Sequence, residues 1–407
     1  MSQEKFDLVM TGPRMEYAVA RALARNDMLS HLHTDIKVSG WAATHVARSP
    51  GHRKIAGRLS RRVATDIPAE RITGHPTLLA TSLLRRRLVA NGRSTLAVDR
   101  QLSRIFRRIA KSCESRSVFG LSANALELFE SRELCLLEQF CNPAEDLAST
   151  LRGELRKYPK WSSDTPHNET GGAERWAARM KREWDRADAI YVPSDHVATA
   201  CAEAGASIDK FVTIPYPSPS IPDRLIRVRS FNGDRPLRVI FAGAVSLAKG
   251  VHYLASALSE FTEGLLDVHI FGQAMLSPYG LRRLEDVAVL HGAVPFDALL
   301  REMYLADLLI HPSLSEGSAL VTLQAAATGL PVIATFESGA PPGSLLVHSR
   351  NASALVGILQ EILDTPTSIN KLSAAALDWA DGWGEMEFAA AIRRFTQFRG
   401  RGDKRSY

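Results

Sequence analysis

The second half of the chain alternates short apolar segments with amphipathic ones, and this alternation restricts the possible folds more than any other feature. A repeated strand, helix, strand pattern predicts a parallel sheet with helices on both faces. Gly329 stands where a helix-ending glycine belongs, and Pro331 prevents that helix from continuing. The expected strands are 237–243, 266–271, 287–290, 307–311 and 331–335, and the expected helices include 250–261, 295–305 and 320–328.

The first half shows the same pattern less clearly. A strand at 6–10 is followed by a tight turn at Thr11-Gly12-Pro13 and a helix at 16–26, and further buried strands are expected at 117–119, 134–137 and 189–192. Residues 214–222 are too rich in proline for a regular helix or a central strand. We therefore predict an α/β protein with one doubly wound domain over 1–215 and a second from 216. A cleft between their strand ends would bind ligands.

Composition agrees with a soluble globular protein of two or three domains, because 407 residues are 45% hydrophobic and 23% charged. The apolar runs are shorter than a membrane span needs, and the first ten residues do not resemble a secretory signal. We therefore expect a cytoplasmic protein. The cysteines show no Cys-x-x-Cys spacing and are expected to be reduced and structural; they are Cys113, Cys135, Cys141 and Cys201.

Positive charge is concentrated in one segment. Residues 41–116 contain 17 Lys or Arg and 4 Asp or Glu, a net charge of +13, while the whole chain carries +6 and the remainder therefore −7. The charges lie in helix-like stretches at 52–62, 83–89 and 102–109. Basic amphipathic helices suit an anionic membrane surface. A merely solvated basic face is the alternative, whereas nucleic acid is disfavoured because no recognised binding motif accompanies the charge.

The window from His311 to Val332 combines a strand end, a carboxylate, a glycine-containing turn and a helix start. Backbone N–H groups around Ser318, Ala319, Leu320 and Val321 would be unpaired donors at the positive end of the helix dipole, where a diphosphate can bind. Glu316 precedes them and can meet sugar hydroxyls, and Gln324 lies further along the same helix. Taken alone, the segment fits a simple helix cap equally well.

A second loop has the same layout after the first strand of this domain. In Phe241-Ala-Gly243-Ala-Val-Ser-Leu-Ala-Lys249-Gly250, Gly243 permits a tight turn and Lys249 precedes a helix, where it can neutralise a phosphate leaving group. One such lysine is usually only solvated. Two loops of this kind in one Rossmann-like domain favour a functional site.

Together these motifs resemble the retaining glycosyltransferases of family 4, which have the GT-B architecture of two Rossmann-like domains facing across a cleft. In that family a glutamate, seven residues and a second glutamate contact the donor sugar and ribose; here the pattern is Glu316 to Gln324. The family's Gly-Arg and Lys-Gly clamp the donor diphosphate; here they are Gly243-Ala244 and Lys249-Gly250. Further donor-lining positions that the resemblance implies are Phe271, Gly272, Gly292 and Val294.

The resemblance also implies an acceptor domain over 1–215, a nucleotide-sugar domain over 216–384 and, over 385–407, a helix that returns to the first domain plus a basic tail. Two positions depart from the family pattern: Gln324 replaces the second glutamate, and Ala244 replaces the clamp arginine, whose charge Arg14 or Arg282 would have to supply. Acceptor-side positions are inferred only from location; they are Gly12, Arg14, Gly120 and Ser122, with His75 as a further guess.

The expected activity is transfer of a hexosyl group from a nucleotide diphosphate sugar to an acceptor hydroxyl, with retention, in envelope polysaccharide or glycolipid synthesis. Neither a metal nor another cofactor is expected, since the chain contains no Asp-x-Asp motif. The expected partners are the nucleotide sugar, a lipid-linked or saccharide acceptor, and the inner face of a membrane. The alternatives are a non-catalytic, nucleotide-sugar-binding subunit at the membrane, and a sugar nucleotide epimerase. A dinucleotide oxidoreductase is disfavoured because no Gly-x-Gly-x-x-Gly follows the first strand of either half.

Overall fold

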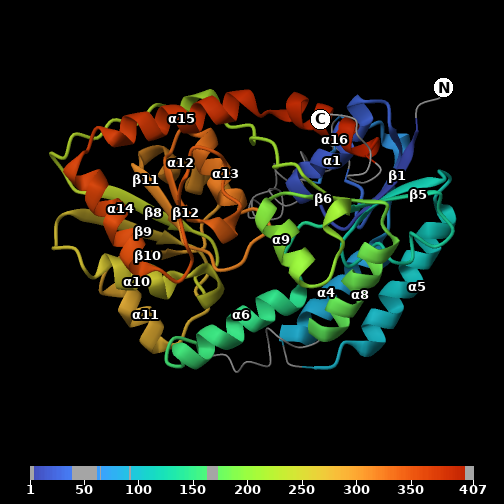
Figure 1. Cartoon of the computed structure of the whole chain (residues 1–407), viewed down its shortest axis with the longest axis horizontal. Helices are drawn as coiled ribbons and strands as arrows, with labels where there is room; N and C mark the ends of the chain where they lie inside the picture. The colour runs from blue at the N-terminus through green and yellow to red at the C-terminus, as the bar shows by residue number, and fades with distance from the viewer. Residues whose placement is uncertain (1–3, 39–61, 65, 91–92, 163–172, 399–407) are drawn as a thin grey trace, which may run out of the picture. The chain divides into compact units, whose positions relative to one another are not determined.

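The computed structural model describes residues 4–38, 62–64, 66–90, 93–162 and 173–398. The chain divides into two compact units (Figure 1). The first unit comprises residues 1–145, 168–216 and 385–407, and the second comprises 146–167 and 217–384. Each unit is built around one parallel sheet. The predicted α/β fold with two Rossmann-like domains is therefore confirmed.

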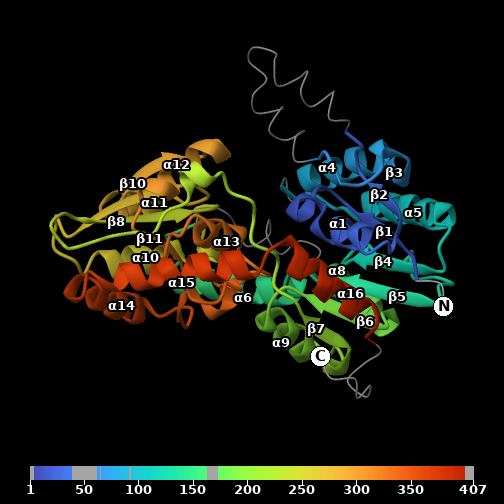
Figure 2. The ribbon, with the colours of Figure 1, turned by 90° about the horizontal axis from the view of Figure 1, so that it is seen from above.

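The sheet of the first unit contains seven parallel strands in the order β3-β2-β1-β4-β5-β6-β7, which Figure 2 shows in sequence. This order reverses direction between β1 and β4, as in doubly wound folds. Every residue of the central strands β1, β4, β5 and β6 is buried, as expected for strands covered on both faces. The strands are β1 (Phe6–Met10), β2 (Leu29–Thr34), β3 (Ile72–Gly74), β4 (Ser117–Leu121), β5 (Leu134–Glu138), β6 (Ala189–Val192) and β7 (Phe211–Thr213).

Helices cover both faces of this sheet. On one face, α1 (Ala18–Arg25) packs against α16 (Glu385–Thr396), and Phe395 of α16 lies 5.8 Å from Phe119 of β4 between ring centroids. The C-terminal helix thus belongs to the core of the first unit although it is last in the sequence. The opposite face carries α4 (Pro76–Ala90), α5 (Leu96–Ser112), α8 (Ala173–Arg186) and α9 (Asp195–Glu203).

The sheet of the second unit contains six parallel strands in the order β10-β9-β8-β11-β12-β13. Successive strands are added to one side of β8 as far as β10 and then, from β11, to its other side. The carboxyl ends of β8 and β11 therefore form a topological switch point, where ligands bind in such folds. The strands are β8 (Leu237–Ala242), β9 (Leu266–Phe271), β10 (Val289–Gly292), β11 (Leu308–His311), β12 (Val332–Thr335) and β13 (Leu345–Val347).

One face of this sheet is covered by α10, α11 and α14, and the other by α12 and α13, on which α15 packs (Figure 1). The first of these faces also receives Leu151 of α6 and Trp161, so residues 146–162 pack on the second unit although they precede most of its sequence. The helices are α6 (Ala144–Lys157), α10 (Val251–Leu258), α11 (Pro278–Glu285), α12 (Phe296–Leu305), α13 (Leu320–Ala327), α14 (Ala352–Asp364) and α15 (Ser368–Gly382).

A buried carboxylate fixes α6 to the second unit. Glu154 Oε2 lies 2.9 Å from His252 Nε2 and accepts a hydrogen bond of 3.0 Å from the Tyr253 hydroxyl, and Arg350 Nε donates to Oε1 at 2.7 Å. Burial would raise the pKa of Glu154, but the hydrogen bonds of His252 and Arg350 outweigh burial and lower it to about 2. The ionised carboxylate is thus a fixed attachment point for α6.

Several elements differ from the sequence-based expectation. Strands β2, β3, β7 and β13 were not predicted, and β10 begins two residues later than expected. The first helix begins at Ala18 instead of Glu16, because Met15, Glu16 and Tyr17 have positive φ angles of 47°, 52° and 64°. The expected helix at 52–62 and the basic tail at 401–407 lie wholly or almost wholly outside the described residues.

Candidate active site

Backbone contacts hold the two predicted loops of the second unit together. After β11, the Leu314 N–H donates to the carbonyl of Ala248 at 2.9 Å, and the Ser313 hydroxyl reaches the same carbonyl at 3.3 Å. Gly250 follows with φ +67°, and a Cβ placed there would lie 2.0 Å from the Pro312 carbonyl oxygen. Only glycine allows this close approach. The Lys-Gly pair is therefore a structural requirement of the loop as well as a motif.

Lys249 and Glu316 form an ion pair between Nζ and Oε1. Their side chains are 21% and 20% exposed, so both remain accessible to a ligand. The two loops therefore bring these side chains into direct contact in the structure. Glu316 is fixed further by its backbone N–H, which donates to the Glu337 carbonyl at 3.0 Å.

His311 is a member of this cluster that sequence reasoning did not assign. Its Nε2 lies 3.4 Å from Glu316 Oε1, and its ring stacks on Phe241 with 5.8 Å between centroids. Burial would raise the pKa of Glu316, but the His311 hydrogen bond and the Lys249 charge outweigh burial and lower it to about 2. The sequence did contain a signal for this role. His311 is the last residue of the buried strand β11 and stands five residues before Glu316.

The helix start after Glu316 differs in one respect from the prediction. α13 begins at Leu320, and the Ala319 N–H is not an open donor, because it donates to the Ser338 carbonyl at 2.8 Å. The prediction that Ala319 offers its N–H to a phosphate is therefore wrong. The reason is tertiary: the turn after β12 approaches this loop, and the Ser318 hydroxyl likewise donates to the Gly339 carbonyl. Leu320 is exposed, whereas Val321 and Gln324 are half-buried.

The remaining predicted donor positions lie at the last residues of three adjacent strands or just after them. The Gly243 N–H donates to the Phe271 carbonyl at 2.9 Å, and the Gly272 N–H donates to the Gly292 carbonyl at 2.8 Å. Gly272 has φ +148°, and a Cβ there would lie 1.6 Å from the Gly243 carbonyl oxygen, so a side chain cannot be accommodated. The Phe271 ring stacks on His291 at 4.5 Å. Val294, two residues after the end of β10, is partly buried against the hydrophobic core of the second unit.

Both candidate replacements for the missing clamp arginine are placed by the structure. Ala244 is exposed in the loop after β8, and Arg282 is exposed on α11 of the same unit. Arg14 belongs to the first unit, where its Nε donates to the Tyr216 hydroxyl at 2.8 Å and lies 3.4 Å from Glu138 Oε1. The Tyr216 hydroxyl in turn donates to Glu138 at 2.5 Å. Arg14 therefore compensates a fully buried carboxylate.

The other acceptor-side positions lie at the ends of two central strands of the first unit. Gly12 follows β1 with φ +87°. Gly120 is buried in β4, where a Cβ would lie 2.6 Å from that of Ala125, and Ser122 follows the strand and is fully buried. The turn that covers Gly120 is held by Glu183, whose carboxylate accepts the N–H groups of Ala123, Ala125 and Leu126 at distances of 2.6 to 3.1 Å.

His75 lies in a histidine cluster instead of beside these loops. Its Nε2 is 3.2 Å from Nδ1 of His33, which packs against His31. One group of the described residues can offer ligand atoms to a metal ion: Asp7, His33 and Cys113 present one such atom each within 4.8 Å of one another, and all three are buried. Asp7 also accepts the Ser115 N–H at 2.8 Å, so the group has a structural role in any case.

Known proteins resemble this chain both in the sequence of its second unit and in its whole fold. Residues 236–365, which contain Lys249 and Glu316, match the family model described as glycosyl transferases group 1. The two Rossmann-like sheets and the solved structures similar to the whole chain identify the fold as GT-B. The residues that match the family model all lie in the second unit.

Among particular proteins, the chain is 26% identical over 241 residues to the D-inositol 3-phosphate glycosyltransferase of Streptomyces griseus. This alignment covers 52% of the chain and 51% of the relative. The chain spans about half or less of the length of the curated relatives it matches. In structure it is similar to sucrose-phosphate synthase of Thermosynechococcus elongatus, with TM-score 0.60 and 15% identity over 97% of this chain and 98% of that one. It is also similar to Anabaena HepE in complex with UDP, with TM-score 0.59 and 13% identity over 97% and 100%.

Proposed function

We propose that the protein is a retaining glycosyltransferase that moves a hexosyl group from a nucleotide diphosphate sugar to an acceptor hydroxyl. The observation that carries the proposal is the Lys249–Glu316 pair, which two hydrogen-bonded loops hold at the carboxyl ends of β8 and β11. The match of this segment to group 1 glycosyltransferases supports it. We assign donor binding to the second unit and acceptor binding to the first.

In the proposed reaction, the bond between the anomeric carbon and the diphosphate oxygen breaks while the acceptor oxygen attacks from the same face. The acceptor proton passes to the departing phosphate oxygen, so the chain needs no nucleophile. Lys249 would stabilise the negative charge that develops on the leaving group, together with the N–H groups of Leu320 and Val321 at the start of α13. A donor of this kind is worth about 3 kcal/mol in the transition state.

Glu316 would bind hydroxyl groups of the transferred sugar and offset positive charge at the anomeric carbon. Its low pKa fits this role, because the carboxylate stays ionised at neutral pH. Gly243, Gly272 and Gly292 allow the backbone to approach the diphosphate and nucleoside. Gln324 would bind the ribose as a neutral amide. We propose that the diphosphate charge is met by these groups without a metal ion, since the sequence contains no Asp-x-Asp motif.

The test compares Lys249→Ala and Glu316→Ala with the wild type and with Lys371→Ala, a lysine of the same unit on α15. Thermal stabilisation by a panel of nucleoside diphosphates, beginning with UDP, identifies the nucleotide, because a ligand of the folded state raises the melting temperature. Donor consumption is then measured with the matching sugar nucleotides. We expect both site variants to lose about 100-fold or more of turnover with the fold intact. Wild-type turnover in both would disprove the assignment.

We further propose that the protein acts at the inner face of a membrane on a lipid-linked or polysaccharide acceptor. No helix among the described residues is both long and apolar enough to span a bilayer. Instead, Leu83 and Leu84 of α4 are 53% and 50% exposed beside Arg85, Arg86 and Arg87. Apolar side chains next to arginines suit the interface of an anionic bilayer.

Vesicle flotation tests this attachment. Binding to vesicles with 30% phosphatidylserine should exceed binding to pure phosphatidylcholine and weaken with added salt, because the electrostatic part is screened. Leu83→Ser/Leu84→Ser should reduce binding, while Leu265→Ser/Leu305→Ser, which alters exposed leucines of the second unit, should not. Equal binding to both vesicle types would contradict the proposal.

Two positions at which the chain departs from the family pattern favour a second candidate function. This candidate is a non-catalytic subunit that binds a nucleotide sugar at the membrane. Ala244 removes the clamp charge and Gln324 removes the second carboxylate. Such a protein would be stabilised by a nucleoside diphosphate yet consume no donor with any acceptor. Interconversion of donors without an acceptor would instead indicate an epimerase.

A further inference from the structure

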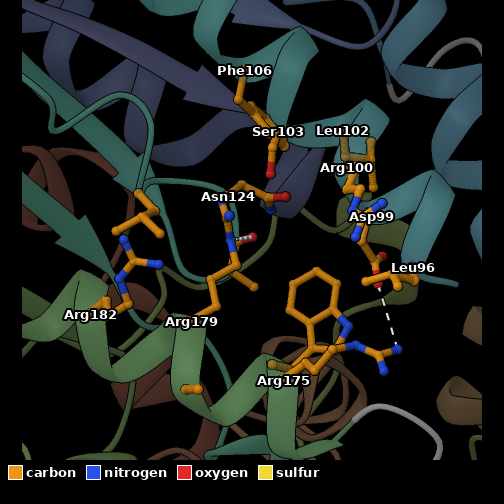
Figure 3. A pocket seen from close by; sticks show the side chains of 14 residues that line it. Leu96, Asp99, Arg100, Leu102, Ser103, Phe106, Asn124, Arg175, Arg179 and Arg182 are labelled. Atoms are coloured by element: carbon orange, nitrogen blue, oxygen red, sulfur yellow. Dashed lines mark hydrogen bonds and ion pairs between the residues drawn. The ribbon is translucent and has the colours of Figure 1, made fainter.

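A pocket of about 440 Å³ lies in the first unit between α5, α8 and the turn after β4. This volume falls within the range of small-molecule sites. Figure 3 shows the side chains of α5, with Ser103 and Phe106, opposite those of α8, with Arg179 and Arg182. Asn124 connects the pocket to the end of β1, because its amide lies 3.5 Å from the Thr11 hydroxyl.

The walls of this pocket are apolar. Leu102 and Phe106 of α5 are buried in the core of the unit, and Leu126, in the turn after β4, is a further buried residue of the lining. Trp176 of α8 closes one side, and the Arg85 guanidinium packs on its ring at 4.1 Å, which holds the indole in place. Leu96 at the start of α5 is 43% exposed. An apolar ligand group would therefore bury surface here.

The polar lining is strongly positive. Four arginines (Arg100, Arg175, Arg179 and Arg182) face one carboxylate, Asp99, so the lining carries a net charge of +3. Two of the arginines have structural duties: Arg179 binds Glu127 and the Ala123 carbonyl, and Arg175 donates to the Thr95 hydroxyl at 3.2 Å. Arg100 and Arg182 are exposed, and no carboxylate among the described residues pairs with either.

We propose that this pocket binds the phosphate-bearing end of a membrane lipid, with Arg100 and Arg182 on the phosphate and the apolar walls on the first part of the chain. Arginine binds phosphate through two parallel hydrogen bonds, which suits a fixed rim. A soluble sugar phosphate would bind the arginines but would leave the apolar walls of the pocket exposed to water. A neutral lipid would leave the two free guanidinium groups without a partner. The ligand that uses both surfaces is an anionic amphiphile.

Calorimetry on the full chain tests the proposal with three probes that separate the two surfaces. n-Decyl phosphate, kept below its critical micelle concentration, has both groups; n-decyl maltoside has the chain alone; glucose 6-phosphate has the phosphate alone. We expect n-decyl phosphate to bind at least about tenfold more tightly than either of the others, since each lacks one of the two contacts. Equal or tighter binding of glucose 6-phosphate would overturn the lipid assignment.

Paired variants separate the pocket from general surface charge. Arg100→Gln/Arg182→Gln should lower the affinity for n-decyl phosphate at least tenfold and leave that for n-decyl maltoside unchanged. Arg107→Gln/Lys181→Gln makes the same charge change on the same two helices outside the pocket and should have little effect. Equal losses in both pairs would overturn the proposal. Trp176→Phe should abolish the fluorescence change that the probe causes in the wild type.

The inference does not depend on the proposed glycosyl transfer. The probes are measured without a sugar nucleotide, and stabilisation by the nucleoside diphosphate should be the same in Arg100→Gln/Arg182→Gln as in the wild type. Failure of the wild-type protein to bind n-decyl phosphate, with turnover present, would defeat the pocket assignment alone. Lipid phosphate binding in a protein without turnover would defeat the proposed function alone.

Discussion

The two units share one sheet topology and differ in where their polar residues are used. In the second unit, Lys249 and Glu316 pair at the strand ends and both stay partly exposed. In the first unit, the corresponding loops are held by internal pairs: Arg14 binds Tyr216 and Glu138, and Glu183 accepts N–H groups of the turn after β4. The same fold therefore presents an accessible ion pair at the strand ends of one unit and an apolar pocket with several arginines in the other.

This difference predicts that the two units respond unequally to substitution of the glycines near their strand ends. Gly250→Ala should cost about 3 kcal/mol, because it combines φ +67° with a contact of 2.0 Å to the Pro312 carbonyl, and it should abolish stabilisation by the nucleoside diphosphate. Gly120→Ala meets only side-chain and Cα atoms of Ala125 and Phe129, so it should cost less and leave nucleotide binding intact. Melting curves with and without nucleotide measure both effects.

Gly357→Ala is the control, since this glycine lies inside α14 with no atom within 4 Å of the added Cβ. It should leave stability unchanged or raise it by less than about 1 kcal/mol, as alanine favours a helix. If Gly250→Ala proved as harmless as Gly357→Ala, the close approach of the two donor loops would be refuted.

Acid should weaken the second unit through its two paired carboxylates. Glu154 and Glu316 have folded pKa values of about 2, below the ordinary 4.5, so the unfolded chain binds more protons between these values. Their stabilisation is complete above pH 4.5 and is lost as the pH falls toward 2. For the buried Glu154 the loss amounts to about 3 kcal/mol.

Hydrogen exchange followed by mass spectrometry measures this effect separately in each unit. Glu154→Gln should accelerate exchange in α6 and α10 at pH 7 and reduce the further acceleration on acidification. Glu361→Gln, an exposed position on α14, should match the wild type. Unchanged exchange in α6 of Glu154→Gln would show that Glu154 does not hold this helix on the second unit.

The smallest expected effect concerns the departure at Gln324. Restoring the carboxylate with Gln324→Glu should strengthen nucleoside diphosphate binding about two- to tenfold if the residue meets the ribose, because a charged acceptor forms a stronger hydrogen bond than an amide. Gln101→Glu makes the same change on α5 of the first unit and should have no effect on nucleotide affinity. Titration calorimetry with the nucleotide identified above measures this affinity. An unchanged affinity in Gln324→Glu would show that residue 324 does not contact the ribose.

Several elements could be predicted because their signals are local. The strand β6 matches the predicted bounds, since a continuous apolar run between turn residues indicates a strand covered on both faces. The strand β9 also matches, and in it Leu266, Val268 and Ile270 alternate with other residues, as in a strand with one more deeply buried face. β2 was missed because Leu29–Thr34 contains two histidines and a serine, which interrupt the apolar run. β7 and β13 were missed because three residues are too few to form a pattern.

The amino-acid sequence by itself determined the α/β class, the central strands of both sheets and the positions of the Lys249 and Glu316 loops along the chain, because hydrophobic period, glycine position and motif spacing act over a few residues. Only the tertiary structure decided that His311 joins the pair, that the Ala319 N–H is already used by Ser338, and that Glu154 ties α6 to the second unit. Each of these contacts joins residues whose distance in space depends on how the strands and helices pack. Burial, which sets the strength of such contacts, is a property of the whole packed unit.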